Sequence, residues 1–232
     1  RHDRIYTIAF RRARDLGVTV LLNTDVIGAV AVHEHNRSGA ANPRSPDRIA
    51  ALRTRCAKTG NETTIEVDAV VNATNAWAPR MSRLLGGMDL PINPVKRYLY
   101  FQRRPPGLCS DVEWNALPFT IYGMGSGRGA YSRPENNSQM MYGWAHPTPP
   151  EPDFTDEDQD RIQSGFRHTD GESYGIKVLS QVADFAPELA GPGGLVATTS
   201  GYYADTPDHN FIIGFDPQRP NLLHCAGCSG HG

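Results

Sequence analysis

The residues with the clearest capacity for chemistry lie at the end of the chain. A buried-strand pattern, Leu222–Ala226, leads into small and polar residues: Gly227, Cys228, Ser229, Gly230, His231 and Gly232. A strand that enters a helix through such residues leaves several backbone N–H groups without partners, and these donors suit an anion or an electron-rich ring. Glycine also lets a flat ligand approach the backbone closely. The residues alone fit a ligand loop and a ligand-free turn equally well.

A basic side chain in the middle of the chain could hold a substrate carboxylate. Arg133 is the candidate, because a guanidinium binds a carboxylate through two parallel hydrogen bonds. The alternative is an ordinary solvated surface arginine. Lys96 and Arg97 are weaker candidates for the same role.

Two other patterns imitate cofactor sites. Gly125–Ala130 (GSGRGA) fits the spacing of a dinucleotide loop, but a proline and no helical pattern follow it, so we predict a hairpin loop. A second set offers zinc-ligand residue types: His224, Cys225, Cys228 and His231. Zinc sites usually draw ligands from two separated segments, and a strand turns His224 and Cys225 to opposite faces. We therefore predict no metal site.

Composition describes an ordinary globular chain. The 232 residues are 39% hydrophobic and 21% charged, with a formal net charge of -2. This net charge does not favour binding to nucleic acid or to an anionic membrane. No apolar run reaches the roughly 20 residues that a transmembrane helix needs. Four scattered cysteines do not form a disulfide scaffold and favour reduced thiols. We expect the protein to be located in the cytoplasm or the mitochondrial matrix.

The first part of the chain predicts an α/β sheet with an antiparallel excursion. Apolar residues at helical spacing from Ile5 predict a helix that Gly17 ends. Two segments that bracket the turn signal KTGNE predict a hairpin. The remaining predictions are buried strands at Val18–Leu22, Val26–Val32 and Asp68–Thr74, and a helix over Trp77–Leu85.

The pattern changes after Pro91–Pro94. Short strand candidates separated by Pro and Gly follow, which is typical of a mostly antiparallel domain. Thr155 and the acidic residues after it predict the start of a helix over Thr155–Phe166. Buried-strand patterns return near the end of the chain.

The block Gly201–Gly232 resembles the flavin-contacting segment of the D-amino-acid oxidase superfamily, in the branch of sarcosine oxidase, glycine oxidase and dimethylglycine dehydrogenase. Three more segments resemble that branch in the same order: Gly17–Val30, Asp68–Gly86 and Gly129–Pro147. Cys228 replaces the usual Phe. The matching residues of the block are Tyr203, Thr206, Asp208, Ile212, Ile213, Gly214, Gly227, Ser229, Gly230, His231 and Gly232.

The resemblance implies FAD as cofactor and assigns residues to it. Val26 would lie by the adenine through its backbone, and His231 near the pyrimidine end of the flavin. Asn75 stands where Gly is usual, so close backbone approach is less expected there. The full set of implied cofactor residues is Val26, Ala73, Thr74, Asn75, Trp77, Gly227, Cys228, Ser229, Gly230, His231 and Gly232.

The resemblance also implies substrate-side roles. Tyr203 matches a tyrosine that faces the substrate, whereas Tyr202 should point to the other face of its strand. Core packing is the alternative for Tyr203, and a hydrogen-bonded turn histidine is the alternative for His231. Gly201 occupies the place of a flavin-linked cysteine, so that tether cannot form here. The candidate catalytic residues are Tyr203, His231 and Arg133.

The implied fold class is α/β plus antiparallel β. An incomplete Rossmann-like FAD-binding domain, residues 1–92 and 201–232, would carry an inserted, mostly antiparallel substrate-binding domain at 93–200. The Gly-x-Gly-x-x-Gly unit that opens family members is not in the sequence, and the chain does not start with Met. We therefore expect a part of a longer polypeptide, with weak FAD binding by itself.

The implied function is FAD-dependent oxidation of the C–N bond of a secondary amine or an amino acid, by hydride transfer to flavin. The partner would be a small-molecule amine or amino-acid substrate, and membership of a larger oxidoreductase as a subunit is compatible. The alternative is a non-catalytic scaffold or assembly factor with the flavin fold.

Overall fold

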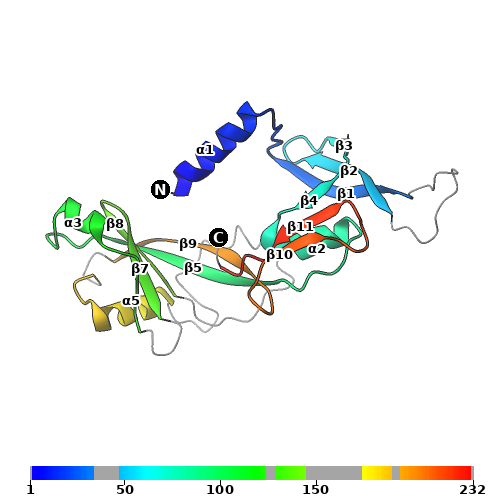
Figure 1. The fold of residues 1–232 in the computed structure, drawn as a ribbon. Coiled ribbons are helices and arrows are strands. Elements are labelled where there is room, and N and C mark those ends of the chain that lie inside the picture. The colour runs from blue at the N-terminus through cyan, green and yellow to red at the C-terminus, as the bar shows by residue number, and fades with distance from the viewer. Residues whose placement is uncertain (1, 34–46, 124–128, 145–173, 190–193, 231–232) are drawn as a thin grey trace. The chain divides into compact units, whose positions relative to one another are not determined.

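The computed structural model describes residues 2–33, 47–123, 129–144, 174–189 and 194–230 (Figure 1). The chain divides into two compact units. Unit 1 comprises Arg1–Ala73, Pro79–Leu90 and Ile213–Cys225; unit 2 comprises Thr74–Ala78, Pro91–Ile212 and Ala226–Gly232. The predicted helix Thr155–Phe166, together with His231 and Gly232, lies outside the described residues.

Unit 1 begins with helix α1 (His2–Asp15) and a three-stranded antiparallel sheet in the order β1-β2-β3. Gly17 follows the helix with a φ of 89°, a left-handed conformation that glycine adopts without steric cost. The strands are β1 (Thr24–Val32), β2 (Arg48–Cys56) and β3 (Glu62–Glu66). The predicted helix, the strand at Val26–Val32 and the hairpin are confirmed.

The strand predicted at Val18–Leu22 is wrong. This segment has no regular secondary structure and is exposed, with Val18 at 52% and Leu22 at 69% of their full accessibility. A strand forms only where a neighbour accepts its backbone hydrogen bonds, and no described strand pairs with this segment. Apolar composition alone therefore did not determine its conformation.

A second sheet of three strands has the order β10-β11-β4. The strands are β10 (Ile212–Phe215), β11 (Leu222–Ala226) and β4 (Val70–Asn72), and β11 runs parallel to β4. Its buried side chains join those of β2 in one core cluster: Ile49, Val70, Leu85 and Leu222. Asn221 ties β2 to this sheet, because its side chain accepts from Ile49 N–H (2.8 Å) and donates to Ile49 C=O (2.7 Å).

The chain after β4 forms a short 3-10 helix, η1 (Asn75–Trp77), and then helix α2 (Ala78–Leu84). Gly86 ends this helical stretch at a φ of 73°. The predicted strand at Asp68–Thr74 and the predicted helix that follows it are thus confirmed, with shorter bounds for the strand.

A buried polar network holds the turn after α2 to the β10–β11 hairpin of unit 1. The carboxylate of Asp216 accepts from Met88 N–H (2.8 Å) and lies 2.8 Å from Nε2 of His224. The other ring nitrogen of His224 lies 3.3 Å from the amide nitrogen of Asn72. Burial acts to raise the pKa of Asp216, but hydrogen bonds from His224, Met88 and Gln218 outweigh it and hold that pKa below its ordinary value.

Unit 2 is built on a five-stranded antiparallel sheet in the order β6-β7-β8-β5-β9. The strands are β5 (Asn93–Arg103), β6 (Thr120–Ile121), β7 (Ala130–Asn136), β8 (Gln139–Trp144) and β9 (Leu195–Asp205). Tyr100 and Tyr142 pair across the sheet and pack with Val178 and Val182 of helix α5 (Tyr174–Phe185). The mostly antiparallel arrangement of strands that was predicted after Pro94 is confirmed.

The segment Gly125–Ala130 connects β6 to β7, which are antiparallel neighbours. Its described end, Ala130, accepts a hydrogen bond from Tyr122 N–H at 2.7 Å through its carbonyl. Residues 125–128 lie outside the described residues, so the hairpin loop stays a prediction, which the antiparallel pairing of β6 with β7 favours.

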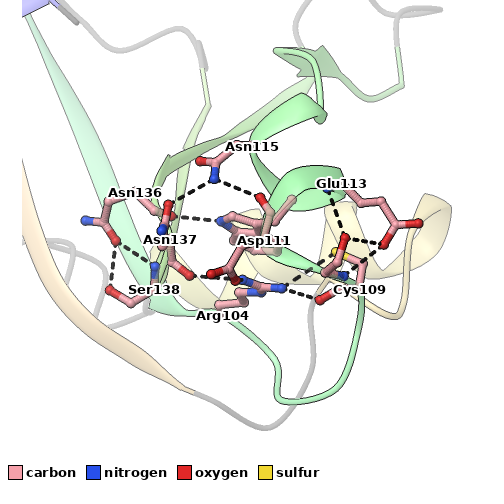
Figure 2. A network of polar contacts seen from close by, with 10 residues as sticks. Arg104, Cys109, Asp111, Glu113, Asn115, Asn136, Asn137 and Ser138 are labelled. Atoms are coloured by element: carbon pink, nitrogen blue, oxygen red, sulfur yellow. Dashed lines mark hydrogen bonds and ion pairs between the residues drawn. The ribbon is translucent and has the colours of Figure 1, made fainter.

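A network of polar contacts around Arg104 stabilises the sheet of unit 2 at the end of β5 (Figure 2). The Arg104 side chain lies over the Trp114 ring at 4.8 Å, bonds to Asp111 at 2.6 Å and donates to the Cys109 carbonyl. Beside it, Ser110 and Glu113 form a capping box at the start of helix α3 (Asp111–Ala116). The network fixes a short helix whose Trp114 is fully buried in the core cluster of unit 2.

Candidate functional site

The sheet of unit 2 has two chemically different faces. In-register residues share a face, and the face packed by α5 carries Tyr100 and Tyr142. The pairing of β7, β8, β5 and β9 places a different group on the opposite side, which we call the arginine face. Its members are Arg97, Tyr131, Arg133, Gly201 and Tyr203.

Arg97 of β5 and Tyr203 of the edge strand β9 lie side by side on the arginine face. The Arg97 guanidinium carbon lies 5.2 Å from the centre of the Tyr203 ring, within cation–π distance. Tyr202 points to the other face, where it meets Trp77 edge-on at 6.2 Å and Lys96 at 5.9 Å. The prediction that the two tyrosines face opposite ways is confirmed.

Open space lies beside this pair. Gly201 is in register with Arg97, and a Cβ added to Gly201 would meet no heavy atom of the described residues within 4 Å. The backbone here is therefore uncovered between two side chains that can bind a ligand. Gly201 is also the residue that stands where the family resemblance places a flavin-linked cysteine.

Tyr131 extends the arginine face toward β8. Its ring lies across Gly143, where an added Cβ would come within 2.5 Å of three of its atoms. Burial, together with the neighbouring Tyr203, raises the pKa of Tyr131 to about 12, while Arg97 and Arg133 act in the opposite direction. Tyr131 thus stays a neutral hydrogen-bond donor at physiological pH.

Arg133, the sequence candidate for carboxylate binding, lies on this face but has an acidic neighbour. Its guanidinium bonds to Glu135 at 3.0 Å, with both side chains about one third exposed (34% and 38%). An ion pair with Glu135 reduces the attraction of Arg133 for a second carboxylate. The position of Arg97 makes it the stronger candidate.

The terminal loop, Gly227–Gly230, packs against the end of β9. Ser229 N–H donates to Ala204 C=O (3.1 Å), and the Ser229 hydroxyl accepts from Thr206 N–H (3.1 Å). A Cβ on Gly230 would lie 2.6 Å from the Tyr203 ring. The loop therefore reaches the arginine face at Tyr203.

Thr206 and Asp208 of the Thr-x-Asp motif support this loop. Thr206 is buried, and a Cβ on Gly227 would lie 2.7 Å from its methyl group. The Thr206 hydroxyl donates to Asn210 C=O (2.8 Å). Hydrogen bonds from Asn210 hold the pKa of Asp208 below its ordinary value, which keeps the carboxylate that organises this turn charged.

The amides of the terminal loop are used differently from the sequence expectation. Two of the N–H groups that we expected to be free for a ligand donate within unit 2: Cys228 to the Asn75 side chain (3.2 Å) and Ser229 to Ala204. The tight turn satisfies its own backbone, as buried loops generally must. The loop is thus preformed.

The remaining predicted cofactor residues lie as follows. Val26 is half-buried in β1 against the core cluster of unit 1, next to a bulge between Val26 and Gly28. Ala73 is exposed after β4, and Thr74 C=O accepts from Trp77 N–H (3.0 Å). Their contacts with a cofactor stay predictions, as do those of His231 and Gly232.

The zinc-like residue set is divided by the strand as predicted. His224 is buried between Asp216 and Asn72, whereas Cys225 is exposed. Among the described residues, no cluster of three or more His, Cys, Asp or Glu side chains could hold a metal ion. In the same part of the chain, no helix has both the length and the apolar character needed to cross a membrane.

Sequence reasoning missed two elements of this site. It did not single out Tyr131, although Tyr131 and Arg133 alternate in one strand and must share a face. It also assigned no supporting role to Thr206 or Asn75, because hydrogen bonds between segments more than twenty residues apart leave no local pattern.

The residues present fit a flat cofactor at the terminal loop. Gly227 and Gly230 have φ angles of 79° and 87°, and the uncovered backbone at Gly201 lies on the face that the loop reaches. Small residues permit close approach of a ring, and the side chains of Arg97 and Tyr131 on the same face are hydrogen-bond donors that suit its polar edge.

Comparison with known proteins agrees with this geometry. The bovine (Bos taurus) "FAD-dependent oxidoreductase domain-containing protein 1" is 25% identical over 96% of the chain and 44% of its own length. The L-proline dehydrogenase of P. horikoshii has a TM-score of 0.65 at 25% identity, over 95% of this chain and 48% of that one. Glycine oxidase from Geobacillus kaustophilus has a TM-score of 0.60 at 24% identity, over 94% and 46%, and shows the fold.

The chain thus spans about half the length of the relatives that it matches. The model of the family described as FAD dependent oxidoreductase, DAO, matches residues 2–232. This family has the mixed α/β and antiparallel architecture seen here, and its cofactor is FAD. The chain belongs to the FAD dependent oxidoreductase (DAO) family.

Proposed function

We propose that the full-length gene product oxidises the C–N bond of an amino acid or a secondary amine, in the manner of the sarcosine oxidase, glycine oxidase and dimethylglycine dehydrogenase branch. The observation that carries this proposal is the arginine face, where Arg97 lies in register with Gly201 and beside Tyr203, on the same side of the sheet as Tyr131. A cation with two phenol groups suits a small carboxylate ligand.

FAD, when bound, accepts the hydride that leaves the carbon beside the amine nitrogen. The nitrogen lone pair then forms the C=N bond, and water hydrolyses the imine to an amine and a carbonyl product. The residues that would hold FAD are the predicted set around Val26, Ala73–Trp77 and Gly227–Gly232. Their role is to position the ring, because the redox chemistry belongs to the cofactor.

The residues of this chain would bind and orient the substrate. Arg97 would pair with the carboxylate, and Tyr131 would donate a hydrogen bond to it from a neutral hydroxyl. Tyr203, between Arg97 and the terminal loop, would lie beside the reacting carbon. Such positioning of the reacting atoms supplies a large part of the rate acceleration of an enzyme.

The test uses the full-length gene product with FAD. Anaerobic addition of sarcosine, dimethylglycine, glycine, L-proline and D-alanine, one at a time, should bleach the flavin absorbance with at least one of them. The matching carbonyl product should appear in equal amount. A protein that takes up FAD but is reduced by no amine or amino acid would contradict the proposal.

One observation favours the alternative, a non-catalytic scaffold. The terminal loop satisfies Cys228 and Ser229 within the protein, so its shape does not require a ligand. If the full-length gene product is stable, colourless and indifferent to added FAD, the scaffold is the better description. Membership of a larger oxidoreductase would then be tested by co-purification.

A further inference from the structure

Asn75 has an unusual backbone conformation at the start of η1. Its φ is 51°, in the left-handed region that most residues avoid. Asparagine tolerates this region better than other non-glycine residues, because its short polar side chain can bond locally. A residue held in this way reports that its surroundings fix it.

The side chain of Asn75 bonds to a segment far away in the sequence. Its Oδ1 accepts from Cys228 N–H at 3.2 Å across a separation of 153 residues. Both residues belong to unit 2, and both are half-buried. This contact links the turn after β4 to the terminal loop.

The terminal loop is held on its other side by β9. Ser229, itself at a φ of 45°, bonds through its N–H to Ala204 and through its hydroxyl to Thr206. The Cys228 and Ser229 peptides therefore lie between two elements: η1, which contributes the Asn75 side chain, and β9, which contributes Ala204.

We propose that Asn75 is a positioning residue that latches the terminal loop in the conformation that receives FAD. This inference rests on the proposed function, because it requires that the loop contact the cofactor. The latch separates two properties of Asn75: the left-handed backbone, which glycine shares, and the Oδ1 acceptor, which glycine lacks. Without the acceptor the loop must be ordered by the ligand, which weakens binding.

The experiment compares three variants of the full-length gene product. Asn75→Gly keeps the backbone freedom and removes the acceptor, and Asn75→Asp keeps an acceptor oxygen. Asn23→Gly is the matched control, because Asn23 also has a positive φ (52°) but lies in unit 1 after α1. The readouts are the FAD dissociation constant, the visible flavin spectrum and amide hydrogen exchange at Cys228.

We expect Asn75→Gly to raise the FAD dissociation constant about 3- to 10-fold, the effect of one hydrogen bond. The flavin absorbance bands should shift, and Cys228 should exchange faster. Asn75→Asp should restore the dissociation constant to within about 3-fold of wild type. Asn23→Gly should bind FAD like wild type.

Equal FAD affinity and equal spectra for Asn75→Gly and Asn23→Gly would overturn the latch. If Asn75→Gly fails to fold, hydrogen exchange of the wild type and of Asn75→Asp still tests the latch. The latch requires that the Cys228 amide of the wild-type apoprotein be protected from exchange. An unprotected Cys228 amide overturns the latch. A wild type that binds no FAD refutes the proposed function instead. Hydrogen exchange at Cys228 distinguishes this failure from a failure of the latch, because it is measured without FAD.

Discussion

At the scale of single residues, Arg97 and Arg133 have different neighbours on the arginine face. Both project from the same side of the sheet, but Arg133 bonds to Glu135 whereas Arg97 stacks on Tyr203 beside the uncovered Gly201. The ion pair of Arg133 with Glu135 and the contact of Arg97 with the Tyr203 ring give the two arginines different electrostatic surroundings. This difference predicts that a substrate carboxylate binds to Arg97 rather than to Arg133.

Replacing Arg97 should weaken substrate binding more than replacing Arg133. A charge-assisted hydrogen bond contributes about 1.5–3 kcal/mol, so Arg97→Met should raise the KM for the amino-acid substrate about 10- to 100-fold, with a smaller effect on kcat. Arg133→Met is the matched control and should change KM less than about 5-fold. Flavin reduction at varied substrate concentration measures both, and a larger effect at Arg133 would reverse the assignment.

Tyr131 gives the arginine face a defined response to high pH. Its pKa is raised to about 12, so its phenolate should not appear in the absorbance at 295 nm until near that pH. In an unfolded chain a tyrosine ionises near pH 10, so the free energy of unfolding should fall as pH rises from about 10 to 12. The difference between wild type and Tyr131→Phe isolates this contribution. Ionisation of Tyr131 near pH 10 would show that its site is solvated.

At the scale of elements, the β10–β11 hairpin depends on a buried charge. Asp216 accepts hydrogen bonds from His224 and from the turn at Met88, and its pKa is below the ordinary value. The stability that it contributes is complete above the unfolded-state pKa, about 4, and is lost as pH falls through the folded-state pKa.

Asp216→Asn should therefore destabilise the protein by about 3 kcal/mol at neutral pH, because it leaves buried donors without a charged acceptor. The variant should also lose part of the stability decline below about pH 4 that wild type shows. Urea unfolding at pH 7 and at pH 3.5 measures both effects. A variant as stable as wild type at pH 7 would mean that the network is solvated or rearranged.

The network at Arg104 predicts a difference between two adjacent arginines. The Arg104 side chain is 13% exposed and bonds to Asp111 and to the Cys109 carbonyl, whereas Arg103 is exposed at the end of β5. Lysine keeps the charge but cannot reproduce the fork of the guanidinium. Arg104→Lys should lower the free energy of unfolding by about 1–3 kcal/mol, and Arg103→Lys by less than about 0.5 kcal/mol. Equal effects would show that the network contributes no stability.

At the scale of the whole molecule, cofactor binding tests the relation between this chain and its longer relatives. The chain spans 44% of the length of the bovine relative, and the strict Gly-x-Gly-x-x-Gly pattern of a pyrophosphate-binding turn does not occur in its 232 residues. That turn supplies backbone donors and a helix dipole to the pyrophosphate of a dinucleotide.

A 232-residue chain without that turn should bind FAD with a dissociation constant above about 1 µM. Quenching of flavin fluorescence in a titration measures this constant. Micromolar or tighter binding by the chain alone would show that the terminal loop and its neighbours suffice.

The sequence by itself determined most elements and the family. Alternating and helical patterns are local, so they predicted α1, the β1–β2–β3 sheet, the strands of unit 2 and the opposite orientations of Tyr202 and Tyr203. The ordered motifs around Val26, Asn75 and Gly227 identified the flavin-dependent family, and the family match covers the same residues.

Only the tertiary structure decided which side chains meet. Val18–Leu22 has the composition of a strand but no described partner, so it forms none. The sequence predicted that the N–H groups of Cys228 and Ser229 are available to a ligand, yet they donate hydrogen bonds to Asn75 and Ala204. Arg97 gained importance over Arg133 only through the pairing of β5 with β9. Hydrogen bonds and packing between distant segments depend on how the backbone closes in space, and no local pattern encodes that closure.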